Sequence, residues 1–251
     1  MSRVLITGSS TGIGRASVVE LANRGHEVIA TARRPEMLAD LPVAQRLRLD
    51  VNNQDSVDAA IAAAGPLDAI VSNAGETVRG SVEAIPLDEY RRLMELNFIG
   101  ALRVTKAVLP GFRERGAGRV IFVSSVLGRV ALPMVSAYAA SKFALEAVAE
   151  TLAAETGHLG VRVSVLEPGP VATDGGTKAP VYENPAGYEA IEAAFAEVAT
   201  TGVIQAADVA RVVADTLENP DPPLRVAVGR AAQELIFALN NAPPDRPITA
   251  A

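Results

Sequence analysis

Short apolar segments alternate with amphipathic segments along most of the chain. The apolar segments are rich in branched residues, which is typical of strands buried on both faces of a parallel sheet. Several of the segments between them have the spacing of one-sided helices. This alternation predicts an α/β fold with a mostly parallel seven-stranded sheet and helices on both faces. The expected strands are 3–7, 26–31, 46–51, 69–72, 119–123, 162–166 and 224–228.

The alternation predicts a single domain over residues 1–241. The segment from about 174 to 205 interrupts it, with a glycine pair near its start and a helix predicted over 186–199. We expect this segment to form a lid over the substrate, because glycines at its base suit a hinge. An ordered surface insertion is the alternative. The proline-rich residues 242–251 are expected to form a loosely ordered tail.

Composition excludes several classes of protein. The formal charge of −6, with no lysine or arginine cluster longer than a dipeptide, argues against nucleic-acid binding. The absence of cysteine excludes disulfides and thiol catalysis, and His26 and His158 are too far apart to suggest a metal site. No apolar run approaches 18 residues, and no charged and apolar leader precedes the first strand. We expect a cytoplasmic protein with neither a membrane span nor a bound metal.

The first expected strand ends in a glycine-rich turn, which a helix over 15–24 follows. Backbone amides can approach a pyrophosphate only where no side chain intervenes, and a helix N-terminus adds partial positive charge. The turn has no lysine after its second glycine, as a P-loop would, and Ser17 replaces the last small residue of the common dinucleotide fingerprint. The turn therefore predicts a dinucleotide site. The alternative is that its glycines serve only the packing of the strand against the helix. The turn reads Gly8-Ser9-Ser10-Thr11-Gly12-Ile13-Gly14.

The second expected strand ends in Ala32-Arg33-Arg34-Pro35. A carboxylate at this position binds the adenine ribose hydroxyls of NAD(H), whereas an arginine accommodates the 2′-phosphate of NADP(H). The sequence therefore predicts NADP(H), held chiefly by Arg33 with Arg34 beside it. A solvated basic loop is the alternative. After the third strand, Asp50 is expected to accept a hydrogen bond from the adenine amine, beside Val51.

Tyr138 and Lys142 stand four residues apart in an alanine-rich segment that is predicted to be helical. Residues at this spacing share one face of a helix. A phenol has a pKa near 10, and a nearby ammonium lowers it toward the range where general acid–base catalysis is efficient. The alternative is a buried tyrosine beside a lysine whose stem crosses apolar surface.

Together these motifs resemble the short-chain dehydrogenases/reductases, in their short single-domain branch, from Thr7 to about Gly229. The family's Thr-Gly-x-x-x-Gly-x-Gly turn begins at Thr7, and its Asn-Ala-Gly follows the fourth strand as 73–75. The resemblance implies a Rossmann-type doubly wound fold and hydride transfer between NADP(H) and a carbonyl or secondary alcohol. The apolar residues of 174–205 favour a hydrophobic substrate. The Ala-Thr-Ala-Arg-Arg-Pro strand end resembles that of steroid- and retinoid-active members.

The resemblance also implies roles for individual residues. Tyr138 exchanges a proton with the substrate oxygen, and Ser125, 13 residues earlier, donates a hydrogen bond to that oxygen. Lys142 holds the nicotinamide ribose and keeps the tyrosine acidic. Asn97 interrupts its helix and holds a water in a proton relay, while Ser124 is turned toward the sheet. The other cofactor contacts implied are Asn73, Ala74 and Gly75, and then Pro168, Gly169, Val171 and Thr173 in the turn after the sixth strand.

Relatives often assemble as homodimers or homotetramers through the helices that carry Asn97 and Tyr138. Small residues such as Ala140 and Ala147 would allow close helix approach, although packing within the chain explains them equally well. The competing function is a catalytically silent, NADP(H)-binding regulator, which would be expected to lack part of the serine, tyrosine and lysine set. A scaffold protein would not need the glycine turn.

Overall fold

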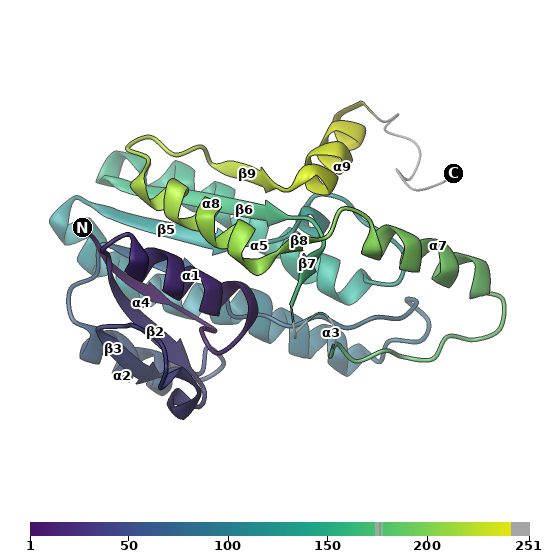
Figure 1. The fold of residues 1–251 in the computed structure, drawn as a ribbon, viewed down its shortest axis with the longest axis horizontal. Helices are drawn as coiled ribbons and strands as arrows, with labels where there is room; N and C mark the ends of the chain where they lie inside the picture. The colour runs from purple at the N-terminus through teal and green to yellow at the C-terminus, as the bar shows by residue number, and fades with distance from the viewer. Residues whose placement is uncertain (174–175, 177, 242–251) are drawn as a thin grey trace.

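The structure is a computed structural model that describes residues 1–173, 176 and 178–241. Its centre is a sheet of seven strands in the order β3-β2-β1-β4-β5-β6-β9 (Figure 1). All six neighbouring pairs are parallel, so the expected α/β fold is confirmed and the sheet is wholly parallel instead of mostly so. The strands are β1 Arg3–Ile6, β2 Glu27–Ala32, β3 Gln45–Arg48, β4 Ala69–Ser72, β5 Gly118–Val123, β6 Val161–Pro168 and β9 Arg225–Val228.

The strand order places a topological switch point between β1 and β4. The chain begins in the centre of the sheet, runs outward through β2 and β3, and then returns to add β4 on the other side of β1. In such sheets the loops that leave β1 and β4 diverge at the carboxyl edge, and ligands bind there. This edge therefore carries both the glycine turn after β1 and the Asn-Ala-Gly loop after β4.

Two apolar clusters cover the two faces of the sheet. Along β1, Leu5 joins one cluster while Val4 and Ile6 join the other, because successive side chains of a strand point to opposite faces. The cluster around Leu5 packs against α2 Gln54–Ala64, α4 Gly100–Arg115 and α5 Ser136–Thr156. The other packs against α1 Gly12–Asn23 and α8 Ala206–Glu218, which lie side by side on the opposite face (Figure 1).

The shorter elements lie mainly beyond the carboxyl edge of the sheet. Figure 1 places α7 there, past the ends of β5 and β6. The α7 helix begins at Glu189, three residues later than the sequence predicted. A helix over 230–241 was not predicted, and it packs over the segment that follows Ser125. These elements are α3 Leu87–Leu93, a π-helix Met94–Ile99, α7 Glu189–Thr200, α9 Arg230–Asn241, β7 Val171–Ala172, β8 Ile204–Gln205, and the 3-10 helices Pro35–Leu38, Val126–Gly128 and Gly157–Leu159.

The third strand ends at Arg48, earlier than the predicted Val51. Its partner β2 ends at Ala32, which is paired with Arg48, so the ladder has no further partner residues. Asp50 and Val51 consequently lie in a turn after the strand.

The segment 174–205 is tied to the rest of the molecule at two places. Its base is closed by β7 and β8, which pair in parallel. Farther along, Tyr182 N–H donates to the Arg79 carbonyl (2.8 Å), and Arg79 N–H donates to the Pro180 carbonyl (2.9 Å). These bonds favour the ordered-insertion alternative for residues 180–182. The predicted hinge residue Gly175 and the predicted tail 242–251 lie outside the described residues. None of the described helices is both long and apolar enough to cross a membrane.

Candidate active site

The glycine turn and the Asn73–Gly75 loop hold each other in place. Thr7 Oγ1 accepts from the backbone N–H groups of Asn73 (2.9 Å) and Ala74 (3.0 Å). Asn73 Nδ2 donates to the carbonyls of Thr7 (3.0 Å) and Gly8 (3.2 Å). A Cβ on Gly14 would lie 2.3 Å from the Gly8 carbonyl oxygen, so this position excludes any side chain. Packing alone accounts for Gly14, whereas Gly8 also has a φ of +69° that favours glycine.

The turn after β6 reaches the glycine turn from the other side. A Cβ on Gly12 would lie 3.2 Å from Thr173 Cγ2. Pro168 is the last residue of β6, and Gly169 N–H donates to the Val228 carbonyl (3.1 Å). The structure therefore brings the first and sixth strand ends together around the N-terminus of α1. Of the other predicted contacts here, Val171 begins β7, Ser10 is half-buried in the glycine turn, and Ile13 packs on the apolar cluster below α1.

The two arginines after β2 are exposed. Arg33 lies with Nη2 3.4 Å from Glu76 Oε1, whereas Arg34 precedes the 3-10 helix that begins at Pro35. Neither is buried in the protein core, so both guanidinium groups are accessible to an anion at the surface, and for Arg33 that anion would compete with Glu76.

The two residues expected near the adenine have different surroundings. Asp50 is half-buried, and its Oδ1 accepts from the Asn52 backbone N–H (3.0 Å). Val51 is buried and packs so closely on α4 that a Cβ on Gly100 would lie 2.7 Å from Val51 Cγ2. Val51 is therefore part of the packing between the β3 turn and α4.

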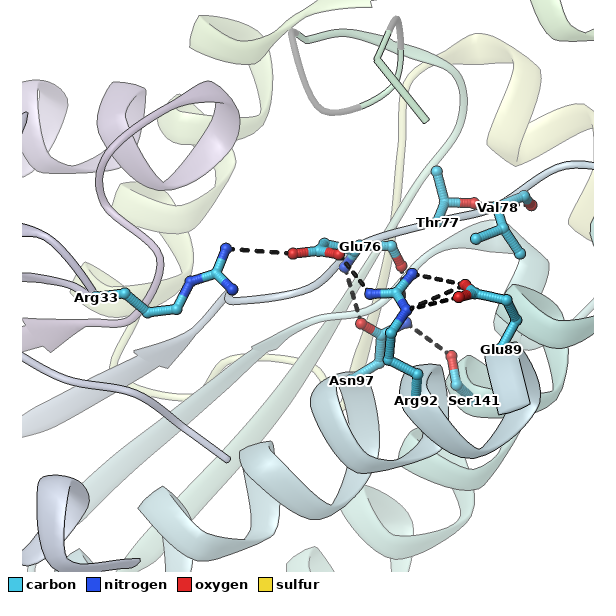
Figure 2. Close-up of polar contacts among 8 residues, drawn as sticks. All are labelled: Arg33, Glu76, Thr77, Val78, Glu89, Arg92, Asn97 and Ser141. Atoms are coloured by element: carbon cyan, nitrogen blue, oxygen red, sulfur yellow. Dashed lines mark hydrogen bonds and ion pairs between the residues drawn. The ribbon is translucent and has the colours of Figure 1, made fainter. Parts of the chain in front are cut away.

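Asn97 is buried within the π-helical segment 94–99 and joins three parts of the site (Figure 2). Its Oδ1 accepts from the Glu76 N–H (2.9 Å), and its Nδ2 donates to the Glu76 carbonyl (2.9 Å) and to Ser141 Oγ (2.9 Å). Ser141 Oγ in turn donates to the Tyr138 carbonyl (2.7 Å). A π-helical turn inside a longer helix is a feature that frequently marks functional sites. Asn97 thus links the loop after β4 to the helix that carries Tyr138.

Ser125, Tyr138 and Lys142 come together at the end of β5. Ser125 Oγ donates to the Pro168 carbonyl (3.4 Å) and accepts from the Leu127 N–H (3.1 Å), and it lies close enough to the Tyr138 phenol to act on its pKa. Lys142 Nζ donates to the Val123 carbonyl (2.9 Å) and lies 5.6 Å from the centroid of the Tyr138 ring. Both Ser125 and Lys142 are buried.

The neighbouring Ser124 is also buried, and its hydroxyl acts on Glu146, where it favours a lower pKa of that carboxyl. Its hydroxyl is therefore placed differently from that of Ser125, which acts on the tyrosine.

Burial controls the protonation of the tyrosine and the lysine. It raises the pKa of Tyr138 to about 12, while the Ser125 hydroxyl acts in the opposite direction. Burial lowers the pKa of Lys142 to about 8, and the negative charge of Glu146 opposes that change. The sequence predicted instead that the ammonium would lower the pKa of the phenol. In the structure the loss of water around the phenolate outweighs any effect of the lysine, whose ammonium is directed to the Val123 carbonyl.

An apolar wall stands beside Tyr138. The buried Val78, Ile85, Leu93 and Ala137 form one cluster, against which Tyr138, Tyr90 and Tyr182 pack. Because Tyr182 belongs to the 174–205 segment and Val78 to the loop after β4, two distant parts of the chain contribute to the surroundings of the phenol.

Two residues of this region were not identified from the sequence. Glu76 follows Asn-Ala-Gly directly, and Ser141 precedes Lys142, so each stands next to a motif that was recognised. Their contacts with Asn97 depend on which backbone groups the π-helical segment brings into reach. No spacing between residues in the sequence predicts these contacts.

Comparisons with known proteins find relatives that match most of the chain. The family model described as short chain dehydrogenase matches residues 2–182. "Oxidoreductase BOA17" of Botryotinia fuckeliana (strain B05.10) is 36% identical over 250 residues, covering 91% of this chain and 89% of that protein. Human "Retinol dehydrogenase 8" is 38% identical over 184 residues, covering 68% of this chain and 59% of that protein.

Solved structures give the same result. A short-chain dehydrogenase from Streptomyces avermitilis has a TM-score of 0.86 and 34% identity, covering 94% of this chain and 91% of that chain. A short chain dehydrogenase from Burkholderia cenocepacia J2315, in complex with NADP, has a TM-score of 0.81 and 28% identity, covering 96% and 93% respectively.

Proposed function

Since this chain belongs to the short-chain dehydrogenase/reductase family and is an oxidoreductase, we propose that it transfers a hydride between NADP(H) and the carbonyl or secondary alcohol of a hydrophobic small molecule. One observation carries the proposal: Ser125, Tyr138 and Lys142 come together at the end of β5, where Ser125 acts on the pKa of the phenol and Lys142 Nζ lies 5.6 Å from the centroid of the tyrosine ring. A proton donor and a second hydrogen-bond donor are thereby available to one substrate oxygen, with a cation close to the phenol.

The residues of the chain fit the cofactor. The glycine turn at the N-terminus of α1 has room for no side chain at Gly8 or Gly14, so its backbone can lie against a diphosphate. Arg33 and Arg34 are exposed and would hold the 2′-phosphate, with Asp50 at the adenine and Lys142 at the nicotinamide ribose. The remainder of the cofactor site would be lined by Asn73, Ala74, Gly75 and the turn from Pro168 to Thr173. When bound, NADP(H) supplies or accepts the hydride.

The protein residues manage the proton and the developing charge. Tyr138 donates its proton to the substrate oxygen during reduction and removes the alcohol proton during oxidation. Ser125 donates a hydrogen bond to the same oxygen, where negative charge develops. Lys142 and Asn97 replenish the proton on Tyr138 through an ordered water. Burial raises the pKa of Tyr138 to about 12, so the phenol is protonated at neutral pH and can act as the proton donor during reduction.

The apolar wall beside Tyr138 supports a hydrophobic substrate. The name of the human relative, a retinol dehydrogenase, agrees with this class of alcohol. We expect residues 1–241 to act as one catalytic domain in the cytoplasm. An assembly through α4 and α5 as a homodimer or homotetramer is supported by Phe143, which is 42% exposed on α5.

The test is purified protein with NADPH and a panel of hydrophobic ketones and aldehydes, followed by loss of nicotinamide absorbance, with NADH in parallel. We expect turnover of at least one ketone and a lower KM for NADPH than for NADH. Tight NADPH binding with no turnover across a broad panel would instead favour the silent regulator.

A further inference from the structure

The carboxylate of Glu76 lies between two arginines. Its Oε1 is 3.4 Å from Arg33 Nη2, and its Oε2 is 2.5 Å from Arg92 Nη1 (Figure 2). Arg92 is also held by Glu89, with 2.8 Å between Nη2 and Oε2. Glu76 therefore pairs with the arginine to which the 2′-phosphate was assigned, although it stands more than 40 residues away in the sequence.

The backbone of Glu76 is fixed by the site itself. Asn97 accepts from its N–H and donates to its carbonyl, both at 2.9 Å. The Glu76 side chain consequently leaves the backbone at a fixed position in the loop after β4. Arg33 starts from the end of β2, and β1 lies between these strands in the sheet. The ion pair thus passes over the end of the strand from which the glycine turn departs.

We propose that Glu76 is a specificity residue that competes with the 2′-phosphate of the cofactor for Arg33. The inference rests on the proposed assignment of Arg33 to that phosphate. A carboxylate and a phosphate both seek the planar fork of a guanidinium, and the phosphate carries more charge. When the phosphate takes Arg33, the Glu76 carboxylate keeps its partner Arg92, so no charge is left unpaired.

The arrangement limits the size of the effect. The side chains of Arg33 and Glu76 are 70% and 40% exposed, and exposed ion pairs are weak. Removing the charge of Glu76 should therefore tighten the binding of a 2′-phosphate by about two- to five-fold, and should leave a cofactor fragment without that phosphate unaffected.

The experiment is calorimetric titration of the full chain at low salt with adenosine 2′,5′-bisphosphate and with adenosine 5′-monophosphate. We expect Glu76→Gln to bind the bisphosphate about two- to five-fold more tightly than the unsubstituted protein, with unchanged affinity for the monophosphate. Glu89→Gln is the matched control, because it removes the other carboxylate partner of Arg92 without a contact to Arg33. It should change neither affinity. In an Arg33→Ala background, Glu76→Gln should lose its effect.

The possible failures are distinguishable. If Arg33→Ala leaves the affinity for the bisphosphate unchanged, the assignment of the 2′-phosphate to Arg33 fails, and the competition fails with it. If the unsubstituted protein binds the bisphosphate no more tightly than the monophosphate, the proposed NADP(H) preference fails. If Arg33→Ala weakens that affinity but Glu76→Gln weakens it too or leaves it unchanged, the competition is wrong while the NADP(H) proposal stands. Equal tightening by Glu76→Gln and Glu89→Gln would also overturn the competition. Circular dichroism of each variant confirms that it is folded.

Discussion

At the scale of single residues, the two serines at the end of β5 have different surroundings. Ser125 acts on the phenol of Tyr138, whereas the buried hydroxyl of Ser124 acts on the carboxyl of Glu146. We expect Ser125→Ala to lower kcat by about 10²–10³-fold, because it removes a donor to the developing oxyanion. Ser124→Ala is the matched control and should keep kcat within about three-fold, since it removes a buried hydroxyl that does not act on the phenol. Steady-state rates on the same ketone measure both, and equal losses would refute the assignment.

Lys142 is a second residue whose burial has a measurable consequence. Its pKa is lowered to about 8, so the folded protein binds its proton less tightly than the unfolded chain does. Burying the ammonium lowers the free energy of unfolding; this destabilisation is fully present below pH 8 and disappears as the pH rises toward 10.5. We expect Lys142→Met to abolish turnover yet raise the free energy of unfolding at pH 7 by about 1–2 kcal/mol, after loss of the bond to Val123.

The measurement for Lys142→Met is denaturant unfolding of the cofactor-free protein from pH 7 to pH 10. The difference from the unsubstituted protein should shrink as the pH rises. A variant that is less stable at pH 7 would show that burying the ammonium does not destabilise the folded protein. A stability difference that does not vary with pH would show the same.

At the scale of elements, the π-helical segment 94–99 acts as a connector. Asn97 makes three hydrogen bonds from it, two to Glu76 and one to Ser141. We expect Asn97→Ala to lower the free energy of unfolding by about 2–4 kcal/mol, because it removes the hydrogen-bond partners of the partly buried Glu76 backbone and one partner of the buried Ser141 hydroxyl. Chemical denaturation measures the change. A loss below about 1 kcal/mol would mean that the loop after β4 is held by other contacts.

The glycine turn offers another test at this scale. A Cβ on Gly14 would lie 2.3 Å from the Gly8 carbonyl oxygen, whereas a Cβ on Gly157 would meet nothing within 4 Å. Gly157 also has a helical φ of −55°. We expect Gly14→Ala to destabilise the protein by more than about 2 kcal/mol and to weaken NADPH binding, and Gly157→Ala to be neutral or slightly stabilising. Thermal unfolding and NADPH titration measure both variants, and similar results would contradict the close packing of the turn.

The elements also show what the sequence could and could not predict. Buried strands such as β4 were predicted because apolar runs and the turns beside them are local signals. The end of β3 was not, because it depends on where its partner β2 stops. The α9 helix was missed although its amphipathic pattern is a local signal that the sequence contains; only the packing of its apolar face on the segment after Ser125 required the structure.

The candidate site divides in the same way. The residue types at Tyr138 and Lys142 could be recognised from their spacing and from the resemblance. The raised pKa of the phenol could not, because it results from the water excluded by the whole fold. The contacts of Glu76 could not be predicted either, since they join segments that are far apart in the sequence or leave different strands.

At the scale of the whole molecule, ion pairs with buried carboxylates connect the last strand, β9, to elements that carry the site. Arg225 of β9 lies 3.1 Å from Glu146 of α5 and 3.5 Å from Glu167 of β6, and both carboxylates are nearly inaccessible to water. Glu146 is also the charge that supports the protonated form of Lys142. The final third of the chain, most of which lies beyond the matched residues 2–182, therefore contributes to the electrostatics of the site.

The proposed activity of the whole molecule depends on the phenol of Tyr138 being the group that exchanges a proton with the substrate. Tyr138→Phe removes only the hydroxyl and keeps the ring that packs in the apolar wall. We expect it to lower kcat by roughly 10²–10⁴-fold or more. NADPH binding, followed by the fluorescence of the bound nucleotide, should stay within about two-fold, because the hydroxyl contributes little to the binding of the whole cofactor. Turnover close to that of the unsubstituted protein would contradict the central claim.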